Sequence, residues 1–341
     1  MDIQAALAQL AEGQNLTQAQ TQTVFHEVMS GAATPAQIGG LLMSMRVKGE
    51  TVEEIAGAAQ TMRALSTKVE IDIPHLVPTC GTGGSSTAKL FNISTAATFV
   101  AAAAGAKVAK HGNRKMTSFS GSADVLEAAG VNIDLAPEQI TRCISEVGVG
   151  FLFAQAHHSA MRYAAPIRQE LKVRTMMNLL GPLTNPANAK RQVVGVFSEQ
   201  WQQALAEVLK LLGSEHVLVV HSNGLDEIAL DKSSLVVELK DGNISHYEIT
   251  PEDFDIKQQS TESLHADSPS SSFALLKDSL TKPDSAAADI VSLNAGAAIY
   301  ASGVATTLAN GVTMAQDVIA AGLAKERLDE LVRISRMMGE Q

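Results

Sequence analysis

The stretch Cys80-Gly81-Thr82-Gly83-Gly84-Ser85-Ser86-Thr87 decides how this chain is interpreted. Three glycines in four positions let the backbone adopt positive φ angles and approach a ligand with no Cβ in the way. Apolar residues precede the stretch, as at the end of a strand, and residues 95–104 have the composition of a helix closed by Gly105. A strand, a glycine-rich turn and a helix start bring backbone amides and the helix dipole together. The stretch therefore predicts an anion-binding site in an α/β domain.

A second polar segment, Lys110-His111-Gly112-Asn113-Arg114, follows the short apolar run 106–109. Two cations flank its glycine, and a hydroxyl-rich stretch leads to Ser122, which we expect to cap a helix over residues 123–129. This composition suits a clamp for phosphate groups, and the alternative is a solvated turn. Two anion-binding segments indicate a ligand with more than one phosphate. Neither segment matches a dinucleotide fingerprint or a Walker A loop.

The composition restricts the class of protein. The 341 residues are 45% hydrophobic and 18% charged, which is typical of a globular enzyme with one or two domains. A formal charge of −10 argues against general nucleic-acid binding, although a local basic pocket for a small anion fits. Two cysteines, Cys80 and Cys143, are too few for a disulfide framework or a zinc site. The N-terminus has no signal-peptide pattern, and the longest apolar run, 96–105, is well short of the roughly 20 residues that span a bilayer. We expect a cytoplasmic protein without a membrane partner.

The hydrophobic pattern changes near residue 70. Before it, helix-start patterns at Thr17, Thr34-Pro35 and Thr51 introduce amphipathic stretches with no strand pattern. These predict a small all-helical domain over residues 1–70, whose apolar stripes either form its core or contact a second subunit. Residues 71–341 alternate short strands and helices, so we expect a larger domain with a mainly parallel central sheet flanked by helices.

Two strands and the helix between them define this second pattern. Runs 193–197 and 217–221 have strand composition, and 199–212 that of a helix, which implies parallel pairing through a right-handed crossover. Polar composition predicts surface loops, and Ala-rich composition predicts the helices that cover the sheet. The loops are expected at 257–272 and 281–287, and the last helices at about 286–302 and 313–338.

Adjacent carboxylates, Asp226-Glu227, come directly after the second of these strands. Ligands of open α/β sheets bind outside the carboxyl ends of the strands, and paired carboxylates there can hold Mg²⁺. An exposed acidic turn is an equally good interpretation of this pair. Arg168 and Arg174 flank a short helix-like segment near the proline-rich residues 181–186, and an arginine at this place is a candidate for binding a carboxylate. His157-His158 lacks the further ligands of a zinc site and fits a pocket wall or a cap.

Taken together, these segments resemble the anthranilate phosphoribosyltransferases along nearly the whole chain. The matching motifs, in order, are Gly81-Thr82-Gly83-Gly84, Asn92-Ile93-Ser94-Thr95, Lys110-His111-Gly112-Asn113-Arg114, Ser120-Gly121-Ser122-Ala123-Asp124-Val125-Leu126-Glu127, Val173-Arg174-Thr175, Gly181-Pro182-Leu183-Thr184-Asn185-Pro186 and Leu225-Asp226-Glu227. The wider superfamily includes pyrimidine nucleoside phosphorylases, which combine a helical domain with an α/β domain.

The resemblance implies a set of ligand-binding residues. Those expected around phosphoribosyl pyrophosphate (PRPP) are Gly81, Gly84, Ser85, Asn92, Ser94, Thr95, Lys110, Asn113 and Ser118. Those expected around anthranilate are Gly81, Asn113, Arg168, Gly181 and Pro182, and those expected around Mg²⁺ are Ser94, Asp226 and Glu227. No side chain is assigned as a general base. Residues of about 160–185 are expected to join the helical domain, and this domain is expected to form a homodimer.

The chain departs from the family pattern near the glycine-rich stretch. Ser85 stands where the family carries an aspartate, and the loop from there to Asn92 is one residue longer than in the family. Pro78 stands where many members carry a further aspartate. Phe119 replaces a usual lysine. The resemblance implies transfer of the phosphoribosyl group of PRPP to the amino group of anthranilate, in tryptophan biosynthesis. The alternatives are a related transferase or phosphorylase with another aromatic acceptor, and a ligand-binding paralogue without catalysis.

Overall fold

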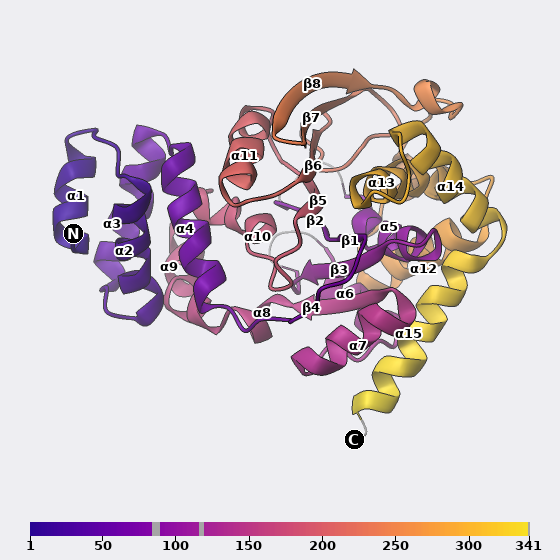
Figure 1. Cartoon of the computed structure of the whole chain (residues 1–341), viewed down its shortest axis with the longest axis horizontal. Helices are drawn as coiled ribbons and strands as arrows, with labels where there is room; N and C mark the ends of the chain where they lie inside the picture. The colour runs from indigo at the N-terminus through magenta and orange to yellow at the C-terminus, as the bar shows by residue number, and fades with distance from the viewer. Residues whose placement is uncertain (84–88, 116–118, 340–341) are drawn as a thin grey trace.

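The computed structural model describes residues 1–83, 89–115 and 119–339, and it begins with a bundle of four helices at one end of the molecule (Figure 1). These are α1 (Ile3–Ala11), α2 (Gln18–Ser30), α3 (Pro35–Lys48) and α4 (Val52–Leu65). The threonines predicted to start helices, Thr17, Thr34 and Thr51, are the N-caps of α2, α3 and α4, each with a complete capping box. The prediction that this first region consists of helices alone is therefore confirmed.

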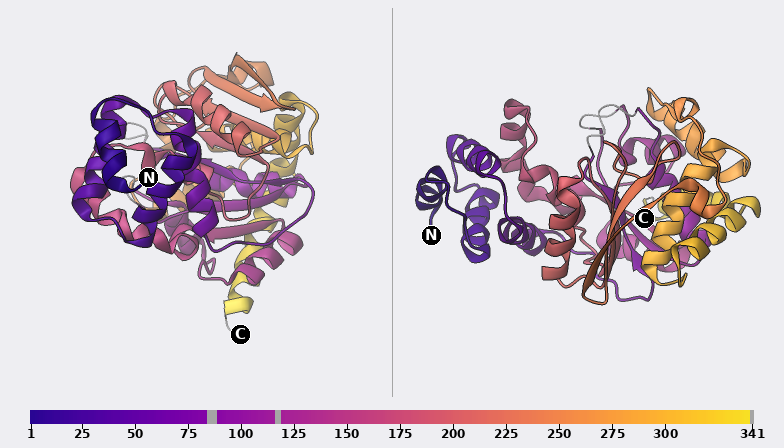
Figure 2. Two further views of the ribbon diagram at one scale, coloured as in Figure 1. Left: turned by 60° about the vertical axis from the view of Figure 1, so that its left-hand side comes forward. Right: turned by 90° about the horizontal axis from the view of Figure 1, so that it is seen from above.

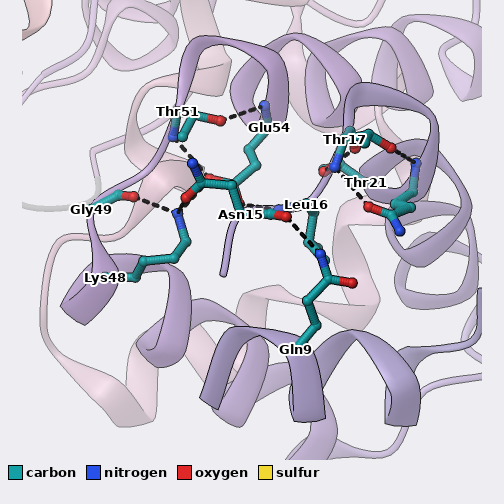
Figure 3. A network of polar contacts seen from close by, with 10 residues as sticks. Gln9, Asn15, Leu16, Thr17, Thr21, Lys48, Gly49, Thr51 and Glu54 are labelled. Atoms are coloured by element: carbon teal, nitrogen blue, oxygen red, sulfur yellow. Dashed lines mark hydrogen bonds and ion pairs between the residues drawn. The ribbon is translucent and has the colours of Figure 1, made fainter. Parts of the chain in front are cut away.

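A buried carboxylate joins the two loops at one end of this bundle (Figure 3). Glu54 Oε1 accepts the backbone N–H of Leu16 at 2.9 Å, and Oε2 accepts that of Thr51 at 2.8 Å. Lys48 Nζ lies 2.9 Å from the same Oε2 and also donates to Asn15 Oδ1 at 2.9 Å. Because every contact of Glu54 is a donor or a cation, its burial is compensated, and the network fixes the α1–α2 loop against the α3–α4 loop.

The strands form two sheets between the bundle and the C-terminal helices (Figure 2). The first has the order β1 (Leu76–Val77), β3 (Lys107–Gly112) and β4 (Val149–Phe153), all parallel. The second has the order β2 (Thr79–Gly81), β5 (Arg191–Gly195), β6 (His216–His221), β7 (Ser234–Lys240) and β8 (Asn243–Ile249). In it β2, β5 and β6 are parallel, whereas β7 and β8 are antiparallel. The mainly parallel arrangement is confirmed, with two sheets in place of one.

Helices cover the sheets and link them to the bundle. α11 (Gln200–Leu211) is the predicted crossover between β5 and β6, and it packs against both β6 and α4. α5 (Ile93–Ala103) and α13 (Ala286–Ser302) pack together in the largest apolar core, where α13 also contacts β5 and β6. The other helices of this region are α6 (Ser122–Ala129), α7 (Pro137–Val147), α12 (Pro269–Thr281), α14 (Leu308–Ala320) and α15 (Leu323–Gly339).

Three sequence-based element boundaries are wrong. The loop predicted over 257–272 ends earlier, because Ser268 Oγ accepts the Ser271 N–H and starts α12 at Pro269. The helix predicted over 313–338 is two helices, since the chain turns at Gly322, whose φ is 76°. Ser122 is the first residue of α6 and not its cap, which is Gly121.

A segment far along the chain packs against the N-terminal helices. It contains α8 (Ala154–His157), η1 (Ser159–Tyr163), α9 (Ala165–Leu171), η2 (Met176–Asn178) and α10 (Leu180–Leu183). Ile167, Met176 and Leu180 belong to the same apolar cluster as Ile38 and Met45 of α3. The location of the domain boundary at residue 70 stays a prediction. Among the described residues, no helix combines the length and apolarity needed to cross a membrane.

Candidate active site

The two acidic residues singled out in the sequence lie at the carboxyl edge of the second sheet, beyond β6. Asp226 Oδ2 accepts the N–H of Gly83 at 2.8 Å, so it contacts the glycine-rich segment after β2. Glu227 Oε1 accepts the N–H of Ser94 at 3.2 Å, in the first turn of α5. Both carboxylates are half-buried. An exposed acidic turn is therefore the wrong interpretation of this pair, because each carboxylate faces a segment predicted to bind phosphate.

Two glycines make this arrangement possible. A Cβ on Gly81 would overlap the Asp226 carboxylate, and a Cβ on Gly195 would overlap the Asp226 carbonyl oxygen. β2 and β5 pair at these two positions, so both glycines face the acidic turn from adjacent strands. Gly195 was not predicted from the sequence, although a glycine inside the expected strand 193–197 was an available signal for a close approach of another segment.

Lys110 lies beneath the site and does not project into it. Its ammonium group is buried on β3 and donates to the carbonyl oxygen of Thr79 at 2.8 Å and to Ser94 Oγ at 3.0 Å. Burial lowers the pKa of Lys110, and the nearby carboxylates Glu227 and Asp226 oppose this shift. The lysine therefore orients the Ser94 hydroxyl and adds positive charge behind the two acids.

The electrostatics of the acidic pair favour a bound cation. Removal from water raises the pKa of Glu227 to about 8, with the neighbouring Asp226 as the next cause and Lys110 opposing. A divalent ion would stabilise the charged form of both acids. Among the described residues no group of three or more His, Cys, Asp or Glu side chains is arranged to hold a metal. Two carboxylates and a hydroxyl fit Mg²⁺, which takes its other ligands from waters and substrate phosphates.

The start of α5 contributes two of the side chains expected around PRPP. Asn92 Oδ1 accepts the Ser272 hydroxyl at 2.6 Å, and its Nδ2 donates to the Ser120 carbonyl at 3.2 Å. Its amide therefore holds α5, α12 and the segment before α6 together. Thr95 Oγ1 is buried and has no hydrogen-bond partner among the described residues. Gly84, Ser85 and Ser118 lie outside the described residues.

Arg114, the second cation of the segment after β3, does not fit a phosphate clamp. Its guanidinium pairs with Glu127 and lies 3.9 Å from Asp124, on α6. That part of the sequence-based prediction is wrong, because acids on the next helix already neutralise the charge. Next to Arg114, the Oδ1 atom of Asn113 accepts a hydrogen bond from Nε2 of Gln155 at 3.2 Å. The Nδ2 atom of Asn113 is not part of this hydrogen bond. Gln155 was also missed from the sequence, where nothing distinguished it.

Arg168 is a partly buried cation on α9. Its guanidinium makes no hydrogen bond or ion pair with any residue that the structure describes. Burial lowers the pKa of Arg168. A guanidinium withdrawn from water without an anion is costly, so this side chain is suited to a ligand carboxylate.

Two histidines lie beside the segment Gly181–Pro186. The rings of His111 and His158 are 5.2 Å apart, and the backbone of Gly181 and of Thr184 bonds to His111 and His158 respectively. Burial is the main cause that lowers their pKa values, to about 3 and about 4. Both imidazoles are therefore neutral near pH 7, and neither Nε2 has a partner among the described residues. His158 is buried, and whether it acts as a pocket wall or a cap stays a prediction. Gly181 and Pro182 stand in α10.

Comparison with known proteins agrees with this geometry. The profile "Glycosyl transferase family, helical bundle domain" matches residues 4–66, and "Glycosyl transferase family, a/b domain" matches residues 73–325. The chain is 56% identical over 339 residues to an anthranilate phosphoribosyltransferase of Marinomonas sp. (strain MWYL1), covering 98% of each chain. It is 55% identical over 346 residues to that of Hahella chejuensis, covering all of both.

The chain belongs to the anthranilate phosphoribosyltransferase family. The Thermus thermophilus member superimposes with a TM-score of 0.91 at 41% identity, over 97% of this chain and 99% of that one. The Saccharomyces cerevisiae enzyme in complex with PRPP and Mg has the same fold, with a TM-score of 0.88 at 22% identity over 98% of both chains. The resemblance inferred from the motifs is thereby confirmed.

Proposed function

We propose that this protein transfers the phosphoribosyl group of PRPP to the amino group of anthranilate, giving N-(5-phosphoribosyl)anthranilate and pyrophosphate in tryptophan biosynthesis. It is thus a glycosyltransferase of the pentosyl class. The observation that carries the proposal is the convergence of Asp226 and Glu227 on the glycine-rich segment and the start of α5, in a chain of this family. Two carboxylates held in place by backbone N–H groups could bind a metal ion that in turn binds pyrophosphate.

The reaction forms a bond between the anthranilate nitrogen and the anomeric carbon and breaks the bond from that carbon to pyrophosphate. The amine is neutral near pH 7, so it attacks without prior deprotonation and loses its proton afterwards. Cleavage at an anomeric carbon passes through an oxocarbenium-like state. The protein therefore contributes by holding pyrophosphate, stabilising its developing charge and aligning the amine.

Three of the residues assigned to PRPP, Asn92, Ser94 and Thr95, lie at the start of α5. The hydroxyl of Thr95, which has no hydrogen-bond partner among the described residues, would donate to a phosphate oxygen. The N–H groups of Gly83 and Ser94 donate to Asp226 and Glu227, so they hold the acidic pair beside this position. Lys110 contributes by orienting Ser94. The remaining members of this assignment are Gly81, Gly84, Ser85, Asn113 and Ser118.

Mg²⁺ would be held by Asp226, Glu227 and the Ser94 hydroxyl. When bound, it would neutralise charge on pyrophosphate as the anomeric bond breaks. The residues fit the ion because two carboxylates lie together where removal from water, and then the charge of Asp226, raises the pKa of Glu227 to about 8.

Anthranilate would bind between α9 and the segment after β3. Arg168 has the geometry and charge to bind the carboxylate, and Asn113 Nδ2 would contact the ring substituents. Gly181 and Pro182 would line the path by which it approaches, and Gly81 would lie beside the reacting amine.

The direct test is a steady-state assay with PRPP, anthranilate and Mg²⁺, following the loss of anthranilate fluorescence and the release of pyrophosphate. One pyrophosphate per anthranilate consumed is expected. Pyrophosphate release without anthranilate loss, or activity only with a different aromatic acceptor, would replace this proposal by one of the alternatives.

We also infer a homodimer formed through the helical bundle, in the cytoplasm. Val47, in the last turn of α3, is 82% exposed, so it offers a position at which a subunit contact of this helix can be tested. Light scattering of the wild type and of Val47→Glu tests it: a dimer that becomes a monomer supports the inference, and a monomeric wild type rejects it.

A further inference from the structure

One side chain of the helical bundle reaches into the segment assigned to anthranilate. Arg63, in the last turn of α4, donates from Nε to the carbonyl oxygen of Leu183 at 2.6 Å. It donates from a terminal nitrogen to Asn188 Oδ1 at 3.2 Å. Leu183 is the last residue of α10, where helical carbonyls have no partner within the helix. α4 and α10 contact each other, and Figure 1 shows the two helices near the junction of the bundle and the larger domain. Arg63 supplies a polar contact between them, beside the apolar cluster that both helices share.

Arg63 is half-buried at this contact. Partial removal from water lowers the pKa of Arg63 to about 10. No carboxylate pairs with it in the part of the chain that the structure describes; the two oxygens that it contacts there are neutral. These two hydrogen bonds fix the direction of the guanidinium.

The same segment is attached to the strand that carries the site. Asn185 Nδ2 donates to the carbonyl oxygen of Ala109 at 2.9 Å, one residue before Lys110. Asn185 Oδ1 accepts the N–H of Ala187 at 2.9 Å, which closes the turn, and the Pro186 carbonyl accepts the N–H of Val69 at 3.3 Å. Residues 180–188, here termed the acceptor segment, are thus held between β3 and the end of the helical bundle.

We propose that Arg63 is a positioning residue for the acceptor substrate: by holding the acceptor segment, it sets the affinity of the protein for an aromatic carboxylate. Arg63 itself contacts neither substrate. The inference rests on the proposed function, because it assumes that Gly181 and Pro182 line the path of anthranilate. The residues assigned to PRPP that the structure describes lie on β2, at the start of α5 and at or just after the end of β3, and none of them has a hydrogen bond to Arg63.

The test compares Arg63→Met with three other variants. Arg63→Lys keeps one donor and the charge. Asn188→Gly removes only the second partner, since Asn188 has a φ of 48° that glycine adopts freely. The control, Arg46→Met, removes an exposed arginine of the same bundle that makes no hydrogen bond or ion pair among the described residues.

We expect Arg63→Met to raise the KM for anthranilate about 10-fold, the equivalent of roughly 1.4 kcal/mol, while the KM for PRPP changes less than about 2-fold. Arg63→Lys and Asn188→Gly should give smaller increases in the KM for anthranilate, and Arg46→Met none. Hydrogen exchange of the amides in residues 180–188 should accelerate in Arg63→Met and not in Arg46→Met.

Several results would overturn the inference. Equal changes in both KM values, or a fall in kcat alone, would mean that Arg63 supports the fold in general. Unchanged exchange in residues 180–188 would mean that Arg63 does not hold them. If Arg63→Met does not fold, the same comparison is made with Arg63→Lys and Asn188→Gly. In these variants too, the KM for anthranilate must rise more than the KM for PRPP, or the inference is rejected. A wild type that does not convert anthranilate would instead reject the proposed function, which the wild-type assay establishes first.

Discussion

Two carboxylates, Glu54 in the helical bundle and Glu227 at the edge of the sheet, both accept an N–H from a helix start, yet their surroundings differ. Glu54 is fully buried and has two backbone donors and the Lys48 ammonium within 2.9 Å. Glu227 accepts the backbone N–H and the hydroxyl of Ser94, yet removal from water and a second carboxylate beside it raise its pKa to about 8. Glu54 thus has a cation in hydrogen-bond contact, whereas the nearby charge of Lys110 does not offset the effects that raise the pKa of Glu227. This difference distinguishes a residue of the fold from a residue of the site.

The same contrast extends to neutral polar groups. Buried side-chain atoms without a hydrogen-bond partner, within the ranges that the structure describes, occur on Thr95, His111, His157, His158, Gln192 and Gln203. None of these lies in α1–α4, and Thr95, His111 and His158 lie beside the residues assigned to the two substrates. Three of these six residues thus lie where ligands are proposed to bind, and none lies in the four-helix bundle.

The largest effect is expected for Glu227→Gln. Turnover should fall more than about 100-fold, since even indirect partners of a metal are worth about 10- to 100-fold. The thermal midpoint should stay the same or rise, because the substitution removes a charge that burial disfavours. Steady-state kinetics and thermal unfolding check both. A large loss of stability would place Glu227 in the same class as Glu54.

Glu54→Gln should show the opposite behaviour. The free energy of unfolding should fall by about 3 kcal/mol, the cost of breaking a buried ion pair. Activity per folded molecule should remain within about 3-fold, because the site lies in the other region. The control is Glu53→Gln, an exposed neighbour in the same helical turn. Denaturant unfolding would contradict this expectation if both variants were equally stable.

Arg168→Met tests the same difference, between a residue of the fold and a residue of the site, for a positively charged side chain. A charge-assisted hydrogen bond contributes about 1.5–3 kcal/mol, so the KM for anthranilate should rise roughly 10- to 100-fold. The KM for PRPP should change little, and stability should not fall, since the guanidinium has no partner among the described residues to lose. Substrate titrations measure the two constants separately. An effect confined to PRPP would show that the assignment is wrong.

The smallest effect is a pH dependence of stability. The pKa values of His111 and His158 are lowered in the folded state, to about 3 and about 4. The two histidines therefore contribute fully to the free energy of unfolding above the pKa of an unfolded histidine, about 6.5. This contribution is lost as the pH falls from there towards about 4. Replacing His158 by Gln should flatten the fall in unfolding free energy between about pH 6.5 and about pH 4.5. Parallel curves for variant and wild type would mean that His158 does not titrate on unfolding.

Local signals in the sequence predicted much of the fold. The threonine caps of α2, α3 and α4 and the parallel pairing of β5 with β6 follow from patterns that neighbouring residues determine. The start of α12 was missed because serine-rich composition concealed the cap at Ser268. The break at Gly322 was missed because alanines continue on both sides of it.

The site was less predictable, because its geometry depends on contacts between distant segments. The sequence placed Asp226 and Glu227 after a strand but left open whether they face solvent or a ligand. It presented Arg114 as a cation free for phosphate, whereas Glu127 on the next helix neutralises it. The role of Arg63 has no local pattern at all, since its partners lie more than one hundred residues away.

The most direct test of the metal site is a Mg²⁺ titration of the initial rate, at saturating PRPP and anthranilate, for the wild type and Asp226→Asn. The amide oxygen of the variant can still accept the Gly83 N–H, so the fold of the glycine-rich segment is kept. We predict a Mg²⁺ midpoint about 10-fold higher or more in the variant, with an unchanged thermal midpoint. Superimposable titration curves would contradict this prediction, because the acidic pair would then have no part in holding the ion.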